Sequence, residues 1–179
     1  MARHWRRAAL AALAVAPLAL GIGAYGASAL GAAPGGGDMV ITWSQNVQTI
    51  DPNKIYNAED WNVGHALYVG LYDFGRNAQL VPALADGMPQ VSDHGLVYTI
   101  HLRPGLHWSN GAPITAYDFA ASINRELNPK TQSPDGYLWY MLKGAQAVES
   151  GHATSVAGVR VLNATTIQYT LTQPYPPFP

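Results

Sequence analysis

The sequence YTIHLRPGLHWSNGAPITAYDF, from Tyr98 to Phe119, combines the signals of a strand and two turns. Over its first five residues apolar and polar side chains alternate, a pattern typical of a β-strand with one buried face. The alternation places Tyr98, Ile100 and Leu102 on one face and their polar neighbours on the other. Pro104-Gly105 ends this strand, and Asn110-Gly111 predicts a second tight turn.

The same stretch ends with the first residues of a predicted helix. Thr115 is followed three residues later by Asp118, the spacing of a capping box. The helix is predicted to run to about Leu127, with Phe119, Ile123 and Leu127 facing inward. Strand, turn and helix together favour a fold that mixes both kinds of element.

Upstream, Met39–Ser44 has the β-branched and aromatic content of a strand, and Asp51-Pro52-Asn53 predicts a turn. Asn57 with Asp60 has the spacing of a second helix cap. We expect the buried stripe of that helix to consist of Trp61, Leu67, Tyr68 and Leu71.

Downstream, Tyr137–Ser150 is predicted to be one helix closed by Gly151, and Val159–Leu162 with Thr166–Leu171 a hairpin. The last seven residues, 173–179, contain four prolines. Such a segment is expected to be extended, unable to close a core, and to lead into more protein. The chain therefore has the character of a fragment.

The first residues predict an export leader. A basic start with Arg3, Arg6 and Arg7 precedes an uncharged apolar stretch, and Ala27-Ser28-Ala29 has cleavage spacing. We predict a signal peptide over 1–29, a flexible tether over 30–38 and the folded part over 39–179. An uncleaved membrane anchor is the alternative, because 24 uncharged residues from Ala8 to Gly31 could span a bilayer.

Composition excludes several classes of protein. The 179 residues contain no cysteine, which excludes disulfide scaffolds, thiol catalysis, cysteine zinc sites and a Cys-anchored lipoprotein. Without the leader the body has seven basic and eleven acidic residues, a net charge of −4. That balance offers no basic patch, so a nucleic-acid partner is not expected.

Catalytic and metal-binding patterns are missing from the sequence. No phosphate loop, nucleophile elbow or H-E-x-x-H motif is present. The histidines lack the i, i+4 or i, i+2 spacing that converges on one metal, so neither a metal site nor a cofactor is expected. Asp60 and Asp118 are explained as helix caps, and Glu59 and Glu126 are expected in solvent.

The stretch Tyr98–Phe119 closely resembles the signature of the extracellular solute-binding proteins of family 5, the peptide and nickel receptors of ABC importers. The signature positions are Leu102, Arg103, Trp108, Ser109, Asn110, Gly111, Pro113, Thr115, Asp118 and Phe119. We expect them to form scaffold, with Trp108 packed under its turn. Ile50-Asp51-Pro52 and Val81-Pro82-Ala83-Leu84-Ala85 resemble further family segments in the family's order. The resemblance covers Met39 to Phe178.

The resemblance implies an α/β, periplasmic-binding-protein-like (type II) fold of two lobes, of which this chain is the N-terminal part, a mixed α+β piece. It implies a receptor, not an enzyme, that binds a peptide or another small solute between the lobes and delivers it to the permease subunits of an ABC importer. The location implied is the periplasm or the cell surface. An exported hydrolase and a non-functional truncated receptor are the alternatives.

Ligand contacts are implied at two places. The stretch after the Asp51 turn corresponds to a ligand-facing loop of the family, which nominates Tyr56, Asn57 and Ala58, mainly through their backbone. Tyr137 and Trp139 are nominated because oligopeptide receptors place an aromatic near this position. For Asn57 the helix cap is a competing role.

Overall fold

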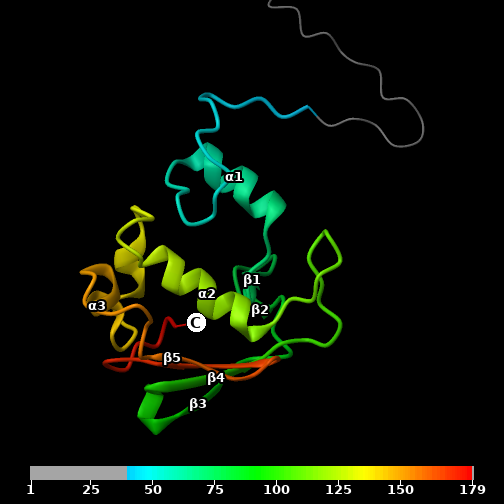
Figure 1. Cartoon of the computed structure of the whole chain (residues 1–179). Helices are drawn as coiled ribbons and strands as arrows, with labels where there is room; N and C mark the ends of the chain where they lie inside the picture. The colour runs from blue at the N-terminus through cyan, green and yellow to red at the C-terminus, as the bar shows by residue number, and fades with distance from the viewer. Residues whose placement is uncertain (1–39, 179) are drawn as a thin grey trace, which may run out of the picture. The chain divides into compact units, whose positions relative to one another are not determined.

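The computed structural model describes residues 40–178. The predicted signal peptide, the whole predicted tether and Met39, that is residues 1–39, lie outside the described residues. The described elements are shown in Figure 1 and are, in chain order, α1 (Ala58–Leu67), β1 (Tyr72–Phe74), β2 (Leu80–Pro82), β3 (Gln90–Ser92), the 3₁₀ turn η1 (Asp93–Gly95), β4 (Val97–His101), α2 (Ala116–Glu126), the 3₁₀ turn η2 (Gly136–Trp139), α3 (Ala145–Glu149), β5 (Val159–Asn163) and β6 (Thr166–Thr170).

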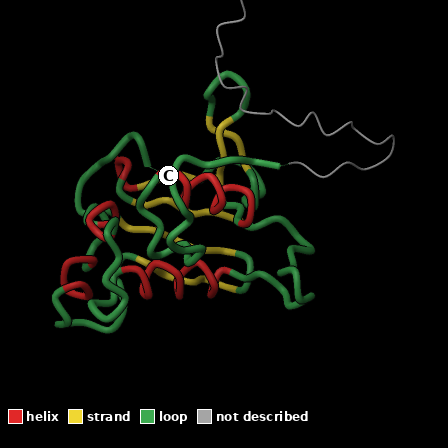
Figure 2. The backbone as a smooth tube through the Cα atoms, turned by 90° about the horizontal axis from the view of Figure 1, so that it is seen from above, coloured by secondary structure: helices red, strands yellow, loops and turns green. Residues whose placement is uncertain are grey.

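Four antiparallel strands form the main sheet, in the order β3-β4-β6-β5, and β1 pairs with β2 in a separate hairpin. In β4 the predicted alternation is confirmed, because Tyr98 and Ile100 are buried and lie opposite Tyr169 and Ile167 of β6. The buried face of these two strands forms the centre of the core. Viewed from above, the two longer helices run roughly along the direction of the strands (Figure 2).

Helix α2 covers the buried face of the sheet (Figure 1). Its start is fixed as predicted, because one carboxylate oxygen of Asp118 accepts hydrogen bonds from the Thr115 amide at 2.7 Å and the Thr115 hydroxyl at 2.8 Å. Ile123 and Leu127 are buried in the core and Phe119 packs against it. The predicted inward face of α2 is therefore confirmed.

The other face of the sheet is polar. Thr99, Gln168 and Arg160 lie in register on three neighbouring strands, and the Gln168 amide donates to the Thr99 hydroxyl at 3.1 Å. The sheet ends on one side at β3, which has three residues, and on the other at β5, where the register shifts between Val161 and Asn163.

Helix α1 differs from the prediction. Its buried residues are Glu59, Asp60 and Gly64, whereas Trp61, Leu67 and Tyr68 are exposed. The helix ends at Leu67, so Leu71 lies outside it. The predicted apolar stripe was wrong because the capped acidic start, and not the apolar residues, determines which side of the helix faces the protein.

The predicted helix Tyr137–Ser150 is broken in two. After η2, Leu142 forms a bridge with Leu171, and Gly144 then takes a left-handed conformation with φ of 81°. An α-helix cannot continue through such a residue, so only Ala145–Glu149 is helical. Gly151, with φ of 76°, follows the helix end as predicted.

The strand predicted over Met39–Ser44 is absent from its described residues, 40–44. A strand needs a neighbour for its backbone hydrogen bonds, and no strand within residues 40–178 pairs with this stretch.

The hairpin of β5 and β6 is confirmed, but the proline-rich end folds back onto it. The Phe178 ring packs edge-on against the rings of Tyr98 and Tyr169, with centroids 4.9 and 5.6 Å apart. The Tyr98 hydroxyl donates to the Tyr175 carbonyl at 3.4 Å. The segment was expected to be unable to close a core, and the structure shows that one of its aromatic rings nevertheless packs against the core.

Candidate functional site

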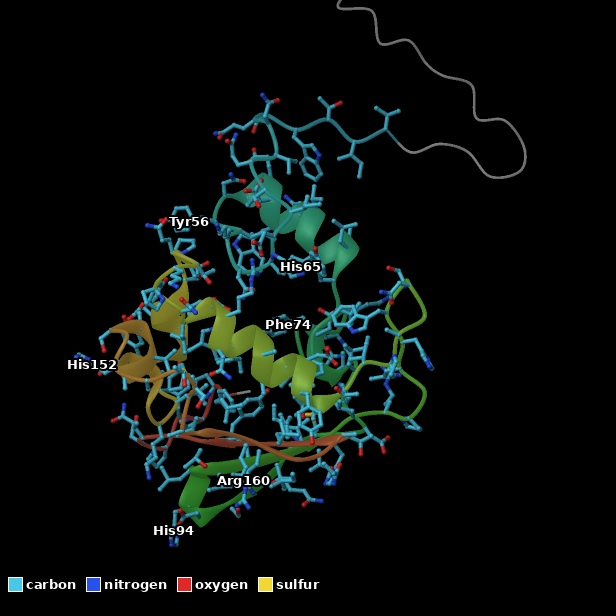
Figure 3. The ribbon with its side chains drawn as sticks, viewed as in Figure 1. Tyr56, His65, Phe74, His94, His152 and Arg160 are labelled. Atoms are coloured by element: carbon cyan, nitrogen blue, oxygen red, sulfur yellow. The ribbon has the colours of Figure 1, made fainter. Side chains whose placement is uncertain are left out.

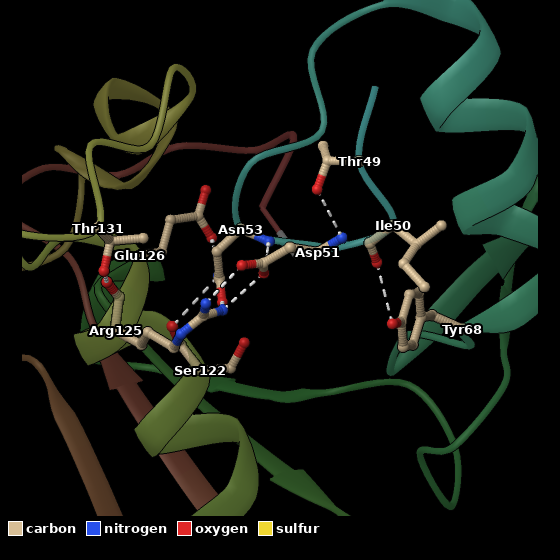
Figure 4. A network of polar contacts seen from close by, with 9 residues as sticks. All are labelled: Thr49, Ile50, Asp51, Asn53, Tyr68, Ser122, Arg125, Glu126 and Thr131. Atoms are coloured by element: carbon tan, nitrogen blue, oxygen red, sulfur yellow. Dashed lines mark hydrogen bonds and ion pairs between the residues drawn. The ribbon is translucent and has the colours of Figure 1, made fainter. Parts of the chain in front are cut away.

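The loop from Asp51 to Asn57 begins with the predicted tight turn. The Lys54 amide donates to the Asp51 carbonyl at 2.9 Å, and the Asn53 amide to the Asp51 carboxylate at 3.2 Å. Pro52 favours such a turn because its ring fixes φ. The Thr49 hydroxyl accepts from the Asp51 amide at 3.0 Å, which extends the ordered backbone toward the N-terminus (Figure 4).

The three nominated contacts of this loop lie where it joins α1. Asn57 is the N-cap, and its side-chain oxygen accepts from the Asp60 amide at 2.8 Å. Tyr56, just before the cap, is 71% exposed and points away from the main sheet (Figure 3). Ala58 opens the helix and is exposed. A ligand at this junction would therefore meet a free tyrosine ring and a helix start whose capping oxygen is already bonded.

Two acidic residues beneath the junction, Glu59 and Asp60, are buried. The sequence had predicted that Glu59 would lie in solvent. One Asp60 oxygen accepts from the Gln48 amide at 2.7 Å, and one Glu59 oxygen accepts from the Ser44 hydroxyl at 2.8 Å. These contacts tie the chain preceding the turn to the first turn of α1. Negative side chains at a helix N-terminus are favourable because they face the positive end of its dipole.

An arginine from α2 holds the turn from the other side. Both Arg125 end nitrogens bind the two Asp51 oxygens, at 2.7 and 2.5 Å, and one of them also donates to the Asn53 side-chain oxygen at 2.5 Å (Figure 4). Such a bidentate pair is stronger and more directional than a single hydrogen bond. The hydrogen bonds from Arg125 hold the pKa of Asp51 below its ordinary value.

A second pair of contacts runs from Asn53 to α2. The Asn53 side-chain nitrogen donates to the Glu126 carboxylate at 3.2 Å and lies 3.5 Å from the Ser122 carbonyl. Burial raises the pKa of Glu126, and the side chains of Trp139, Asn53 and Ser133 oppose this rise. Glu126 was expected in solvent, so its half-buried position is a correction.

The two other nominated aromatics have different environments. Tyr137 in η2 is 58% exposed. Trp139 packs against the main core, and its side chain also interacts with Glu126. Trp139 lowers the pKa of Glu126, the carboxylate that accepts from Asn53. No local pattern could have revealed this network, because Arg125 and Asp51 are 74 positions apart in the sequence.

The signature positions lie in different environments, and the expectation that they form scaffold stays a prediction. Leu102 is buried, and Asn110 stabilises the turn by accepting the Ala112 amide at 3.0 Å. Trp108 is 44% exposed, so its expected packing under the turn was wrong. The turn is closed by main-chain bonds, including one from the Gly111 amide to the Trp108 carbonyl at 2.9 Å, and needs no ring beneath it. The remaining signature positions are exposed (Arg103, Ser109, Gly111 and Pro113) or half-buried (Thr115, Asp118 and Phe119).

Within residues 40–178 no three histidine or acidic side chains converge on a position that could hold a metal ion. Figure 3 shows His65, His94 and His152 well apart from one another. The helices of this part of the chain are all too short or too polar to cross a membrane.

Comparison with known proteins gives a consistent result. The family model described as "Bacterial extracellular solute-binding proteins, family 5 Middle" matches residues 79–179. The chain is 37% identical over 133 residues to the probable deoxycholate-binding periplasmic protein YgiS of Escherichia coli, covering 73% of this chain and 25% of that protein. It is 32% identical over 137 residues to the periplasmic oligopeptide-binding protein OppA of the same organism, covering 74% of this chain and 24% of OppA.

Among solved structures, the chain is similar to Haemophilus influenzae OppA in complex with the peptide RPPGFSPFR. The TM-score is 0.67 at 29% identity, covering 72% of this chain and 26% of that one. The chain thus spans about a quarter of the length of the relatives it matches.

Proposed function

The chain belongs to the bacterial extracellular solute-binding proteins of family 5, and from this premise we propose that it is part of a receptor that captures peptides or another small solute for an ABC importer. The observation that carries the proposal is the match over residues 79–179, joined to relatives whose names specify oligopeptide binding. The receptor would act without catalysis, in the periplasm or at the cell surface, and the importer's permease subunits would be its partners.

We propose the junction of the Asp51 turn and α1 as the part of this chain that contacts the solute. Tyr56 supports this role because a large exposed ring beside an ordered backbone is a common feature of binding sites. Asn57 and Ala58 would contribute their backbone, since the Asn57 side chain already caps α1. Tyr137 and Trp139 are further candidates; Tyr137 is supported by its exposed ring, and Trp139 by its effect on the pKa of Glu126, which contacts Asn53 of the same turn.

A peptide would be bound largely through its main chain, which explains how such a receptor could accept varied sequences. Side chains of the peptide would be accommodated by water-filled space, since bridging waters replace direct contacts at little cost. Recognition of this kind requires the receptor's own backbone to be held in one conformation, as it is from Thr49 to Lys54.

Isothermal titration calorimetry on the native gene product tests the proposal. The probes are RPPGFSPFR, a mixture of di- and tripeptides, and deoxycholate, chosen because the names of related proteins specify these classes of ligand. We expect saturable binding of at least one peptide probe. Binding of deoxycholate alone would assign another small solute, and binding of none would contradict the receptor proposal. Mass spectrometry of the peptides after incubation distinguishes the exported hydrolase, because only an enzyme would cleave them.

A further inference from the structure

The segment 42–69 is attached to the rest of the described chain in an unusual way. None of its residues belongs to the main apolar core, which is formed from residue 71 onward. Its one buried aliphatic side chain, Ile55, packs locally beside Gly64. Within residues 42–178, the hydrogen bonds and the ion pair that join this segment to residues 70–178 all involve Asp51 or Asn53.

These contacts converge on the last turn of α2. Arg125 binds both oxygens of Asp51 and the side-chain oxygen of Asn53, while the Asn53 nitrogen is directed to Glu126 and Ser122. The Thr131 hydroxyl donates to the Arg125 carbonyl at 2.5 Å and so secures the helix end from which the arginine projects (Figure 4). Asn53 is buried, so both ends of its carboxamide are used within the protein.

We propose that Arg125 is a positioning residue for solute binding: its contacts with Asp51 and Asn53 fix the 51–57 loop, and with it Tyr56, in the binding-competent position. This inference rests on the proposed function. The planar guanidinium is essential because it contacts three acceptor atoms at once, a geometry that a lysine ammonium does not reproduce. Without Arg125 the turn would keep its internal hydrogen bonds but lose its fixed position relative to α2.

The expected kinetic effect follows from this role. If the loop samples several positions, only a fraction of the receptor can accept solute at any moment, and the observed affinity falls by that fraction. The lower affinity results from a slower association rate. The dissociation rate changes little, because the loop is in its binding-competent position once solute is bound. A side chain that only stabilises the fold would leave both rate constants unchanged as long as the protein stays folded.

The test uses Arg125→Met in the native gene product, with Arg160→Met as the matched control. Arg160 is exposed on the polar face of the sheet, so the control makes the same change of charge and length elsewhere. With RPPGFSPFR or the best-binding peptide probe, we expect Arg125→Met to slow association about fivefold and to change dissociation less than twofold. Asp51→Asn is the second variant, which weakens the same contact from the other side, and its effect should not add to that of Arg125→Met.

Four outcomes decide the inference. Unchanged association by both variants, in protein shown to be folded by circular dichroism, would overturn it, and so would an equal effect of Arg160→Met. If the unmodified protein binds no probe, the proposed function is contradicted. The proposal that Arg125 positions the loop for solute binding is then contradicted as well. Hydrogen exchange at amides 53–60 then still decides whether Arg125 fixes the loop: Arg125→Met should accelerate it at least threefold over Arg160→Met, and equal rates would refute that role.

Discussion

Asn57 shows how one side chain decides between two interpretations of the same residue. Its oxygen is bonded to the Asp60 amide, and Asp60 in turn accepts from the Gln48 amide. A change at Asn57 therefore affects the start of α1 and, through Asp60, the chain that precedes the turn. Stability and solute binding can be separated by measuring both in the same variant.

Asn57→Ala should lower the free energy of unfolding by about 1 kcal/mol, because the Asp60 amide loses its acceptor. Thermal unfolding followed by circular dichroism measures this loss. Asn62→Ala, which removes an exposed side-chain contact to the Ala58 carbonyl on the same helix, is the control and should have a much smaller effect. An unchanged melting temperature together with lost peptide binding would show that Asn57 contacts the solute directly.

The ion pair of Asp51 predicts a dependence on pH. Because Arg125 lowers the pKa of Asp51 in the folded state, the stabilisation is fully present above the ordinary aspartate pKa of about 3.9 and is lost as pH falls through the lowered value. Asp51→Asn should therefore cost about 0.5–1 kcal/mol at pH 7, since the pair is partly exposed, and progressively less in acid.

Urea unfolding of both proteins between pH 2.5 and 7 measures this difference. Glu126, whose pKa is raised by burial, changes stability in the opposite direction, since its contribution is lost as pH rises. It does so in both proteins, so its effect cancels in the comparison. A cost of Asp51→Asn that is constant over the whole range would show that the charge of Asp51 contributes nothing.

At the scale of elements, the sequence was sufficient wherever a local pattern and the tertiary packing agree. The alternation in β4 and the Thr115–Asp118 cap of α2 are of this kind, because each is determined within a few residues. Helix α1 was misjudged because its neighbours leave its apolar residues exposed and bury its acids. The helix over 137–150 was misjudged because helix propensity does not reveal that Gly144 is left-handed. Neither the exposure of the apolar residues of α1 nor the left-handed conformation of Gly144 can be deduced from the residues that neighbour them in sequence.

The candidate site likewise has a part that could be predicted from the sequence and a part that could not. The turn at Asp51 and the cap at Asn57 could be predicted from residue types and spacing. The partners of the turn, Arg125 and Glu126, could not, since only the folded chain brings α2 beside it. Each looks like an ordinary charged residue near a helix end until the tertiary structure is known.

Gly158 is where three backbone segments meet. Its amide donates to the Lys143 carbonyl, and its carbonyl accepts from the Thr170 amide, each at 2.7 Å. An added Cβ would lie 2.5 Å from the Thr170 oxygen and 2.8 Å from the Lys143 nitrogen. Gly158→Ala should therefore destabilise the protein by about 1–3 kcal/mol, because backbone atoms cannot move aside as a side-chain end can.

Thermal unfolding measures the cost of Gly158→Ala. Gly70→Ala is the comparison variant and should cost less, because a Cβ there would lie 3.3 Å from its nearest atom, the Tyr72 carbonyl oxygen, a milder approach than at Gly158. Equal melting temperatures of the two variants would show that the β5–β6 hairpin can shift away from the segment before α3.

At the scale of the whole molecule, the described chain has two parts that are stabilised by different kinds of interaction. The sheet with α2 and α3 shares one apolar core, while 42–69 is joined to it by polar contacts. Polar contacts at a partly exposed site contribute little free energy compared with burial of aliphatic and aromatic side chains. The two parts should therefore not open together.

Limited trypsin digestion of the 179-residue chain in increasing urea tests this expectation. Cleavage after Lys54, in the turn, should begin at a lower urea concentration than cleavage after Arg160, in β5, because cleavage requires local opening of the chain. Mass spectrometry of the fragments identifies each cut. Appearance of both cuts at the same urea concentration would show that 42–69 and the sheet open as one cooperative unit.

The outer strands of the main sheet also have a consequence for behaviour at high concentration. An open strand edge invites another molecule to add a strand, and long regular edges drive aggregation. Here one edge, β3, offers only three residues, and the other, β5, is interrupted by its register shift. Within residues 40–178, neither edge provides a regular run long enough to template growth, so addition of strands from other copies to this sheet should be self-limiting.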